Sequence, residues 1–97
     1  MMYRDEYHPQ VKKDLKKLSP NLREAVRTEH IPTILLEPEN GELLTGDLSG
    51  IFSYHLKFVR QEYRIAYVAD EDAKTVFVLM IGKRGEFYRL LKRRIKT

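Results

Sequence analysis

The stretch IFSYHLKFVRQEYRIAYVADEDAKTVFVLMIG, residues 51–82, decides the fold. Apolar and polar side chains alternate over residues 52–58, a pattern typical of a strand with one buried face. Residues 63–68 predict a second strand, and residues 75–81 are apolar at nearly every position, as in a strand buried on both faces. The connections are only a few residues long, and such short links require antiparallel neighbours. The stretch therefore predicts an antiparallel meander of three strands.

Two amphipathic helices are expected before the meander. Val11, Leu15 and Leu18 recur at helical spacing and form one apolar stripe. Ser19, which a proline follows, is a typical N-cap for the second helix. Pro32 should kink or end that helix, with room for one more helical turn after it. So short a connection predicts that the two helices pack together.

The ends of the chain complete the expected layout. Residues 2–7 could form a short strand, although their alternation is weak. A basic helix should begin near residue 86, and its apolar stripe consists of Phe87, Leu90, Leu91 and Ile95. The predicted fold class is α+β: a small antiparallel sheet, two N-terminal helices packed on one face, and a basic C-terminal helix.

Length and composition favour one small folded domain that spans residues 1–97. Hydrophobic residues make up 42% of the chain and charged residues 33%, which excludes a disordered protein. Cysteine is absent, so disulfides and thiolate metal sites are excluded. The first residues lack the apolar core of a signal peptide, and no apolar run approaches the roughly 20 residues that span a bilayer. We therefore expect a cytoplasmic protein without a membrane partner.

Positive charge is concentrated at the C-terminal end. Residues 82–97 hold seven basic residues and one acid, whereas the whole chain has a net charge of +4. The rest of the chain is thus slightly acidic. A basic segment on such a protein suggests a polyanion or an acidic protein as partner. A solvated helix face is the alternative.

Several basic side chains should meet on the sheet face that the two helices leave open. His55 and Lys57 alternate on one strand, and Arg64 lies on the next, where pairing would bring it near them. Arg84 follows the third strand, and Tyr88 comes about one helical turn later. Phosphate groups need such cations, and RNA also needs a stacking surface, which Tyr88 could supply.

Each of these residues also has a purely structural interpretation. His55 could be a solvated strand histidine, and Lys57 could be an exposed lysine that discourages edge pairing. Arg64 could form a surface salt bridge with Glu62 or with another acid, and Tyr88 could belong to the core. Their joint arrangement, and not any single residue, favours a site.

The sequence predicts neither a metal nor a cofactor. His8, His30 and His55 lack the spacing of metal ligands. The glycines around residues 82–85 do not have the spacing of a phosphate-binding loop. No pattern supports a serine triad.

Four segments carry a resemblance to a known family: YHPQVKKDLKKLSP, NGELLTGDLSG, YHLKFVRQEYRIAY and VFVLMIGKRGEFY. Together they span nearly the whole chain, and they resemble the RelE/ParE toxin superfamily. The more specific parts are the pair Tyr63-Arg64 within an apolar strand and the Gly-Lys-Arg run that a tyrosine follows at Tyr88. The resemblance implies the same sheet with two N-terminal helices on one face.

The resemblance also implies an activity and a partner. Ribonuclease members of this superfamily cut mRNA in the ribosomal A site without a metal, and a partner antitoxin silences them. His55 and Lys57 match two positions where such members carry basic residues, and Arg64, Arg84 and Tyr88 match the family's strand arginine, C-terminal arginine and tyrosine. His55 stands where some members have lysine, which leaves the identity of the general base open.

Cleavage would use the RNA 2′-hydroxyl as the nucleophile. His55 is the natural proton acceptor because imidazole titrates near neutral pH, and Lys57 could serve only if neighbouring cations or burial made it neutral. Further RNA contacts are expected from Lys83, Arg89 and Arg93. The basic helix could bind a RelB-like antitoxin, with acidic or amphipathic helices, or ribosomal RNA. The alternatives are a ParE-like inhibitor of DNA gyrase and an inactive member that only binds its antitoxin.

Overall fold

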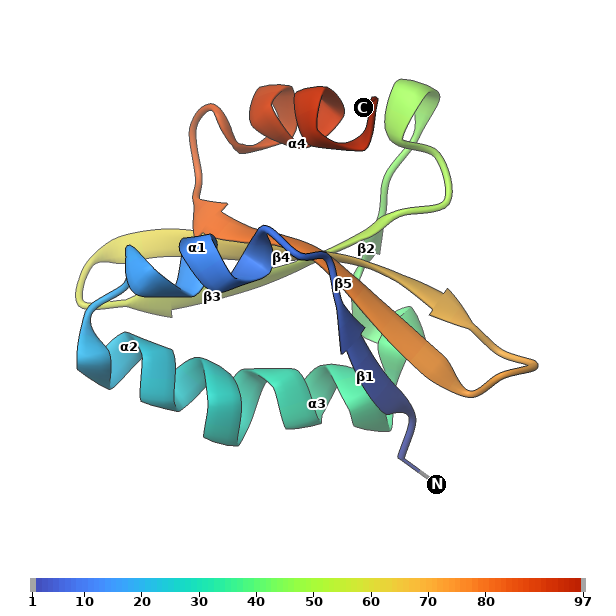
Figure 1. The fold of residues 1–97 in the computed structure, drawn as a ribbon, viewed down its shortest axis with the longest axis horizontal. Helices are drawn as coiled ribbons and strands as arrows, with labels where there is room; N and C mark the ends of the chain where they lie inside the picture. Colours follow the sequence, from blue (N-terminus) through green and yellow to red (C-terminus); the bar gives the residue numbers. More distant parts are fainter. Residues whose placement is uncertain (1, 97) are drawn as a thin grey trace.

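A computed structural model describes residues 2–96 and shows a five-stranded sheet between helices (Figure 1). The strand order is β1-β5-β4-β3-β2. The strands are β1 (Arg4–Tyr7), β2 (Glu42–Leu43), β3 (Phe52–Phe58), β4 (Gln61–Asp70) and β5 (Thr75–Lys83). The helices are α1 (Val11–Lys16), α2 (Pro20–Ala25), the π-helical turn η1 (Val26–His30), α3 (Ile31–Leu36), the short 3₁₀ turns η2 (Pro38–Asn40) and η3 (Gly46–Leu48), and α4 (Phe87–Ile95). None of the helices within residues 2–96 is long and apolar enough to cross a membrane.

The α+β fold class is confirmed, and so is the antiparallel meander of β3, β4 and β5. The N-terminal strand also forms, but it pairs with β5 in parallel, so that Arg4 lies opposite Thr75 and Tyr7 opposite Val78. The sheet is therefore mixed and not purely antiparallel. Three helices and three strands lie between β1 and β5 in the chain, so no tight turn forces these two strands to run in opposite directions.

The N-terminal helices pack on one face of the sheet, as expected. Figure 1 shows α2 and α3 along that face, and their apolar side chains form the larger core with strand residues such as Ile65, Tyr67 and Val78. The Ser19 side chain accepts a hydrogen bond from the Leu22 backbone N–H at 3.2 Å and caps α2. The helical segment does not end at Pro32 but continues through it as α3, which the wider turn η1 precedes.

Tyr67 fixes the connection between α3 and the sheet. Its side chain is fully buried, and its hydroxyl donates a hydrogen bond to the Pro38 carbonyl oxygen. Burial raises the pKa of Tyr67 to about 12. A Cβ at Gly41 would collide with the same hydroxyl, so only glycine lets the chain pass this close.

The opposite face of the sheet is partly covered, which corrects the expectation that it is open. Phe87 and Leu91 of α4 are buried there against Ala66, Leu79 and Met80. Figure 1 shows α4 on the side of the sheet away from α2 and α3. The apolar stripe on α4 explains the difference, because burying Phe87 and Leu91 removes a large apolar area from water.

An irregularity in β5 decides which side chains reach this second face. The register places Ala66 opposite Met80 but Tyr67 opposite Val78, so Leu79 is an extra residue in β5. The extra residue reverses the alternation of side chains for the rest of the strand. Lys83 is consequently placed on the face of the N-terminal helices.

Candidate functional site

The pairing of β3 with β4 builds the centre of the candidate site. His55 lies directly opposite Arg64, and Lys57 lies opposite Glu62, all on the sheet face that carries α4. The Arg64 Nε atom lies 3.5 Å from His55 Nε2. The predicted cross-strand approach is therefore present for His55 and Arg64, and Lys57 shares their face of the sheet.

Tyr88 joins this group from α4. The Arg64 guanidinium carbon lies 5.1 Å from the centre of the Tyr88 ring, a cation–π distance. The Tyr88 hydroxyl donates a hydrogen bond to Ser53 Oγ at 3.1 Å. Tyr88 is half-buried beside Phe87. It packs against the smaller apolar core between α4 and the sheet and also faces the candidate site.

Arg84 reaches the same face just after β5. Its backbone N–H donates to the Glu62 carbonyl oxygen at 3.0 Å, which extends the β4–β5 pairing by one position. Its Nη1 atom lies 3.2 Å from Glu62 Oε2. Glu62 thus pairs with Arg84, whereas the structural interpretation of Arg64 had named Glu62 as one possible partner of Arg64. Both side chains are exposed, so an incoming phosphate could replace the carboxylate.

His55 has an acidic neighbour that the sequence did not indicate. Glu42 Oε1, on β2, lies 3.1 Å from His55 Nε2. The same nitrogen cannot donate a proton to Glu42 and accept one from Arg64 at the same time. When Nε2–H points to Glu42, the Nδ1 atom of neutral His55 carries the free lone pair and is the nitrogen that could accept a proton.

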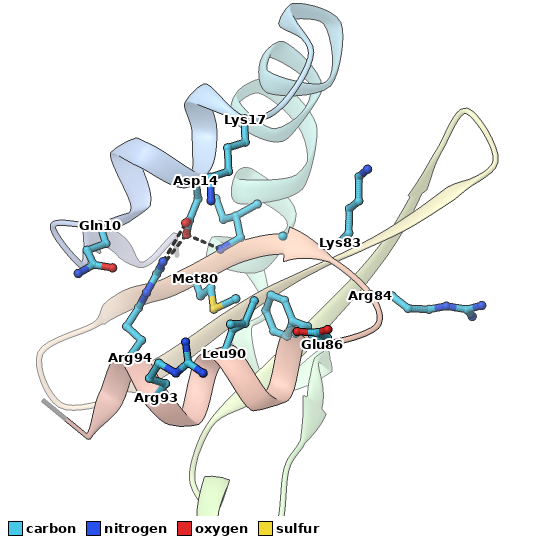
Figure 2. Close-up of a pocket in the computed structure, with 13 residues that line it drawn as sticks. Gln10, Asp14, Lys17, Met80, Lys83, Arg84, Glu86, Leu90, Arg93 and Arg94 are labelled. Atoms are coloured by element: carbon cyan, nitrogen blue, oxygen red, sulfur yellow. Dashed lines mark hydrogen bonds and ion pairs between the residues drawn. The ribbon is translucent and has the colours of Figure 1, made fainter.

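The three residues expected to add RNA contacts do not join the sheet-face group. Lys83 and Arg93 line a cleft of about 700 Å³ between α1, β5 and α4. Figure 2 shows that Lys83 and Arg84 point away from each other, as successive residues of an extended chain do, and the extra residue in β5 decides which of them reaches which face. Arg89 is exposed and pairs with Glu86 one turn earlier on the same helix.

Sequence reasoning missed Glu42 and Ser53 for different reasons. Glu42 belongs to a strand of two residues in a segment without periodicity, so nothing in the pattern places it beside His55. The alternation of the strand correctly predicts that Ser53 lies on the same face as His55 and Lys57, but it does not indicate the contact with Tyr88. Its burial under Tyr88 depends on the docking of α4.

The arrangement provides cations, one imidazole and one aromatic ring on an accessible surface. Two arginines can bind phosphoryl oxygens, and an imidazole can accept a proton. Within residues 2–96, no group of three histidine, aspartate or glutamate side chains is placed to hold a metal ion. The chemistry that the two arginines and the imidazole support is phosphate binding combined with proton transfer.

The fold recurs in known toxins of bacterial toxin–antitoxin systems. Residues 6–92 match the family described as ParE-like toxin of type II bacterial toxin–antitoxin systems. The match covers most of the chain, so this chain belongs to that family. The resemblance to the RelE/ParE toxin superfamily is confirmed.

Individual relatives agree with this assignment. Toxin RelG of Mycobacterium tuberculosis is 31% identical over 90 residues, which are 92% of this chain and 99% of the relative. The toxin–antitoxin complex RelBE2 from the same organism contains a chain with a TM-score of 0.77 and 28% identity, covering 87% of this chain and all of that one. A mutant of Escherichia coli toxin RelE in the free state, 23% identical, shares the fold with a TM-score of 0.73 over 98% of this chain and 99% of its own.

Proposed function

We propose that this toxin is a ribosome-dependent mRNA endonuclease that cuts in the A site without a metal ion and thereby inhibits translation. The observation that carries the proposal is the convergence of His55, Arg64, Arg84 and Tyr88 on one accessible sheet face. An inhibitor that only binds another protein needs neither a proton acceptor nor a pair of phosphate-binding arginines.

The proposed reaction begins with attack of a 2′-hydroxyl on the adjacent phosphorus. The bond from phosphorus to the 5′-oxygen breaks, which leaves a 2′,3′-cyclic phosphate and a free 5′-hydroxyl. His55 takes the 2′ proton, and the departing 5′-oxygen receives a proton from solvent or from a neighbouring donor. Arg64 and Arg84 stabilise the charge that develops on the phosphoryl oxygens, and Lys57 adds to the positive field.

Tyr88 and the two carboxylates have supporting roles in this scheme. The ring of Tyr88 stacks on a base or orients the scissile phosphate, with Arg64 behind it. Glu42 holds Nε2 of His55, which leaves Nδ1 as the nitrogen that accepts the 2′ proton. The Glu62 carboxylate pairs with Arg84 until a substrate phosphate takes the place of that carboxylate.

The ribosome and an antitoxin are the partners that fit this site. His55 and Lys57 are exposed and lie outside the cleft between α1 and α4, and Arg84 lines that cleft but is itself exposed, so the protein supplies little enclosure for RNA at this face. The ribosome would supply the positioning that the open site lacks, which places the proposed activity in the cytoplasm. Several known structures of similar chains are complexes of a toxin with its antitoxin, and we propose a RelB-like antitoxin for this chain too.

A cell-free translation reaction tests the proposal. A defined mRNA is incubated with the purified protein, with and without ribosomes, and new 5′ ends are mapped by primer extension. We expect cuts in phase with codons only when ribosomes are present. Arg64→Ala and Arg84→Ala should each lower kcat by about 10²–10³-fold, because each removes a cation that binds the charge of the transition state.

Arg27→Ala is the matched control. Arg27 is also an exposed arginine paired with a glutamate, but it belongs to η1, among the N-terminal helices and away from the candidate site. It should leave cleavage within about two-fold of the parent rate. Intact mRNA in the presence of ribosomes would refute the nuclease proposal. A DNA supercoiling assay would then decide between a gyrase inhibitor and an inactive antitoxin-binding protein.

A further inference from the structure

Within residues 2–96, two polar side chains are buried, Asp14 and Ser53, and both of them bind α4. Ser53 accepts a hydrogen bond from the Tyr88 hydroxyl near the start of α4, and Asp14 accepts hydrogen bonds from the Arg94 guanidinium near the end of α4. Burying a polar side chain is unfavourable unless it is bonded, and α4 supplies a partner to each of these residues. The second contact lies outside the candidate site and has no role in the chemistry described above.

The contact between Asp14 and Arg94 is a two-point ion pair. Arg94 Nη1 lies 2.7 Å from Asp14 Oδ2, and Nη2 lies 2.9 Å from Oδ1. Arg94 Nη1 also donates to the Leu79 carbonyl oxygen at 2.9 Å, and the Ile81 N–H donates to Asp14 Oδ2 at 3.0 Å. Figure 2 shows the pair closing one end of the cleft between α1 and α4. The pairing of β1 with β5 ends at Val78, and Asp14 and Arg94 bind backbone atoms of β5 just beyond that point.

Such geometry defines one position for α4. A buried ion pair is weak evidence for stability, because the loss of hydration offsets much of the attraction. The planar guanidinium fork, however, fits the carboxylate in only one orientation. Arg94 and Tyr88 belong to the same helix, six residues or about 9 Å apart. A helix held at Arg94 therefore has little freedom to tilt or slide at Tyr88.

We propose that the Asp14–Arg94 ion pair positions Tyr88 over Ser53 and Arg64 by fixing the docking of α4. Asp14 and Arg94 are positioning residues and do not touch the substrate. The consequence for cleavage rests on the proposed function, whereas the consequence for the location of Tyr88 does not.

Asp14→Asn tests this proposal because it removes the charge with almost no change of shape. The protein is labelled with 3-fluorotyrosine, and the resonance of Tyr88 among the six tyrosines is assigned with Tyr88→Phe. We expect Asp14→Asn to shift or broaden the Tyr88 resonance and to lower kcat about 10-fold with little change in KM. Glu24→Gln breaks the exposed pair with Arg27 and should change neither quantity.

A double-mutant cycle separates positioning from stability. In the Tyr88→Ala background, Asp14→Asn should lower kcat by less than about two-fold, because there is no longer a ring to misplace. Arg94→Lys keeps a cation beside Asp14 and should move the resonance in the same direction by a smaller amount, which provides a second test if Asp14→Asn does not fold.

Two results would overturn the proposal: an unmoved Tyr88 resonance in folded Asp14→Asn protein, or the same loss of kcat in the presence and absence of Tyr88. If the parent protein does not cleave mRNA, the proposed function fails, and the Tyr88 resonance alone then supports or overturns the positioning.

Discussion

Replacing Val59 with asparagine should stabilise the protein, although nothing in the sequence around Val59 indicates an unfavourable backbone conformation. Val59 and Arg60 form the turn between β3 and β4, and both have positive φ angles, 47° and 67°. The left-handed region costs a residue with a side chain roughly 1–2 kcal/mol, and a β-branched residue is especially unfavourable there, whereas asparagine tolerates it. Val59 is 80% exposed, so its replacement loses little apolar burial. We expect the free energy of unfolding to rise by about 1 kcal/mol.

Urea denaturation followed by far-ultraviolet circular dichroism measures this change. A gain of about 1 kcal/mol should raise the midpoint by roughly 0.3–1 M urea and leave the m-value unchanged. Val59→Thr is the matched control, because threonine is also β-branched and nearly the same shape but polar. The reasoning is refuted if both substitutions change the free energy of unfolding equally, or if Val59→Asn lowers it.

Three further predictions concern stability. Burial lowers the pKa of His30 below its ordinary 6.5, so the unfolded state binds more protons than the folded state at acidic pH. The free energy of unfolding should therefore fall as the pH drops below about 6.5. Urea titrations at pH 7.5 and about 5.5 should show that His30→Gln reduces this loss of stability. Gly41→Ala should cost about 1–3 kcal/mol in urea denaturation because the added Cβ meets the Tyr67 hydroxyl, and Tyr67→Phe in the same chain should recover part of the loss. Leu91→Ala should lower the free energy of unfolding by about 2–5 kcal/mol, whereas exposed Leu90→Ala should cost less than about 1 kcal/mol; equal losses in thermal melts would contradict the packing of α4.

Much of the fold follows from periodicity in the sequence. The alternation over residues 52–58 places His55 and Lys57 on one face, and the short turn to β4 places Arg64 opposite His55. These are local relations, and they do not depend on how distant segments pack. The candidate site was therefore largely predictable along β3 and β4.

Features that depend on distant segments were not predictable. The parallel pairing of β1 with β5 joins residues about 70 positions apart, and the Asp14–Arg94 ion pair spans 80 positions. The extra residue at Leu79 leaves no signal in a strand that is apolar throughout, yet it decides that Arg84, and not Lys83, reaches the candidate site. Glu42 was missed because its strand is too short to show a period.

The central claim is that the 2′-hydroxyl of ribosome-bound mRNA attacks the adjacent phosphate at the site formed by His55, Arg64 and Arg84. Two mRNAs test it most directly: one entirely of ribonucleotides, and one with a single 2′-deoxynucleotide on the 5′ side of the mapped cut. We predict that ribosome-bound all-ribose mRNA is cut and that the 2′-deoxy mRNA stays intact at that position. Cleavage of both mRNAs, or of neither, would contradict the account.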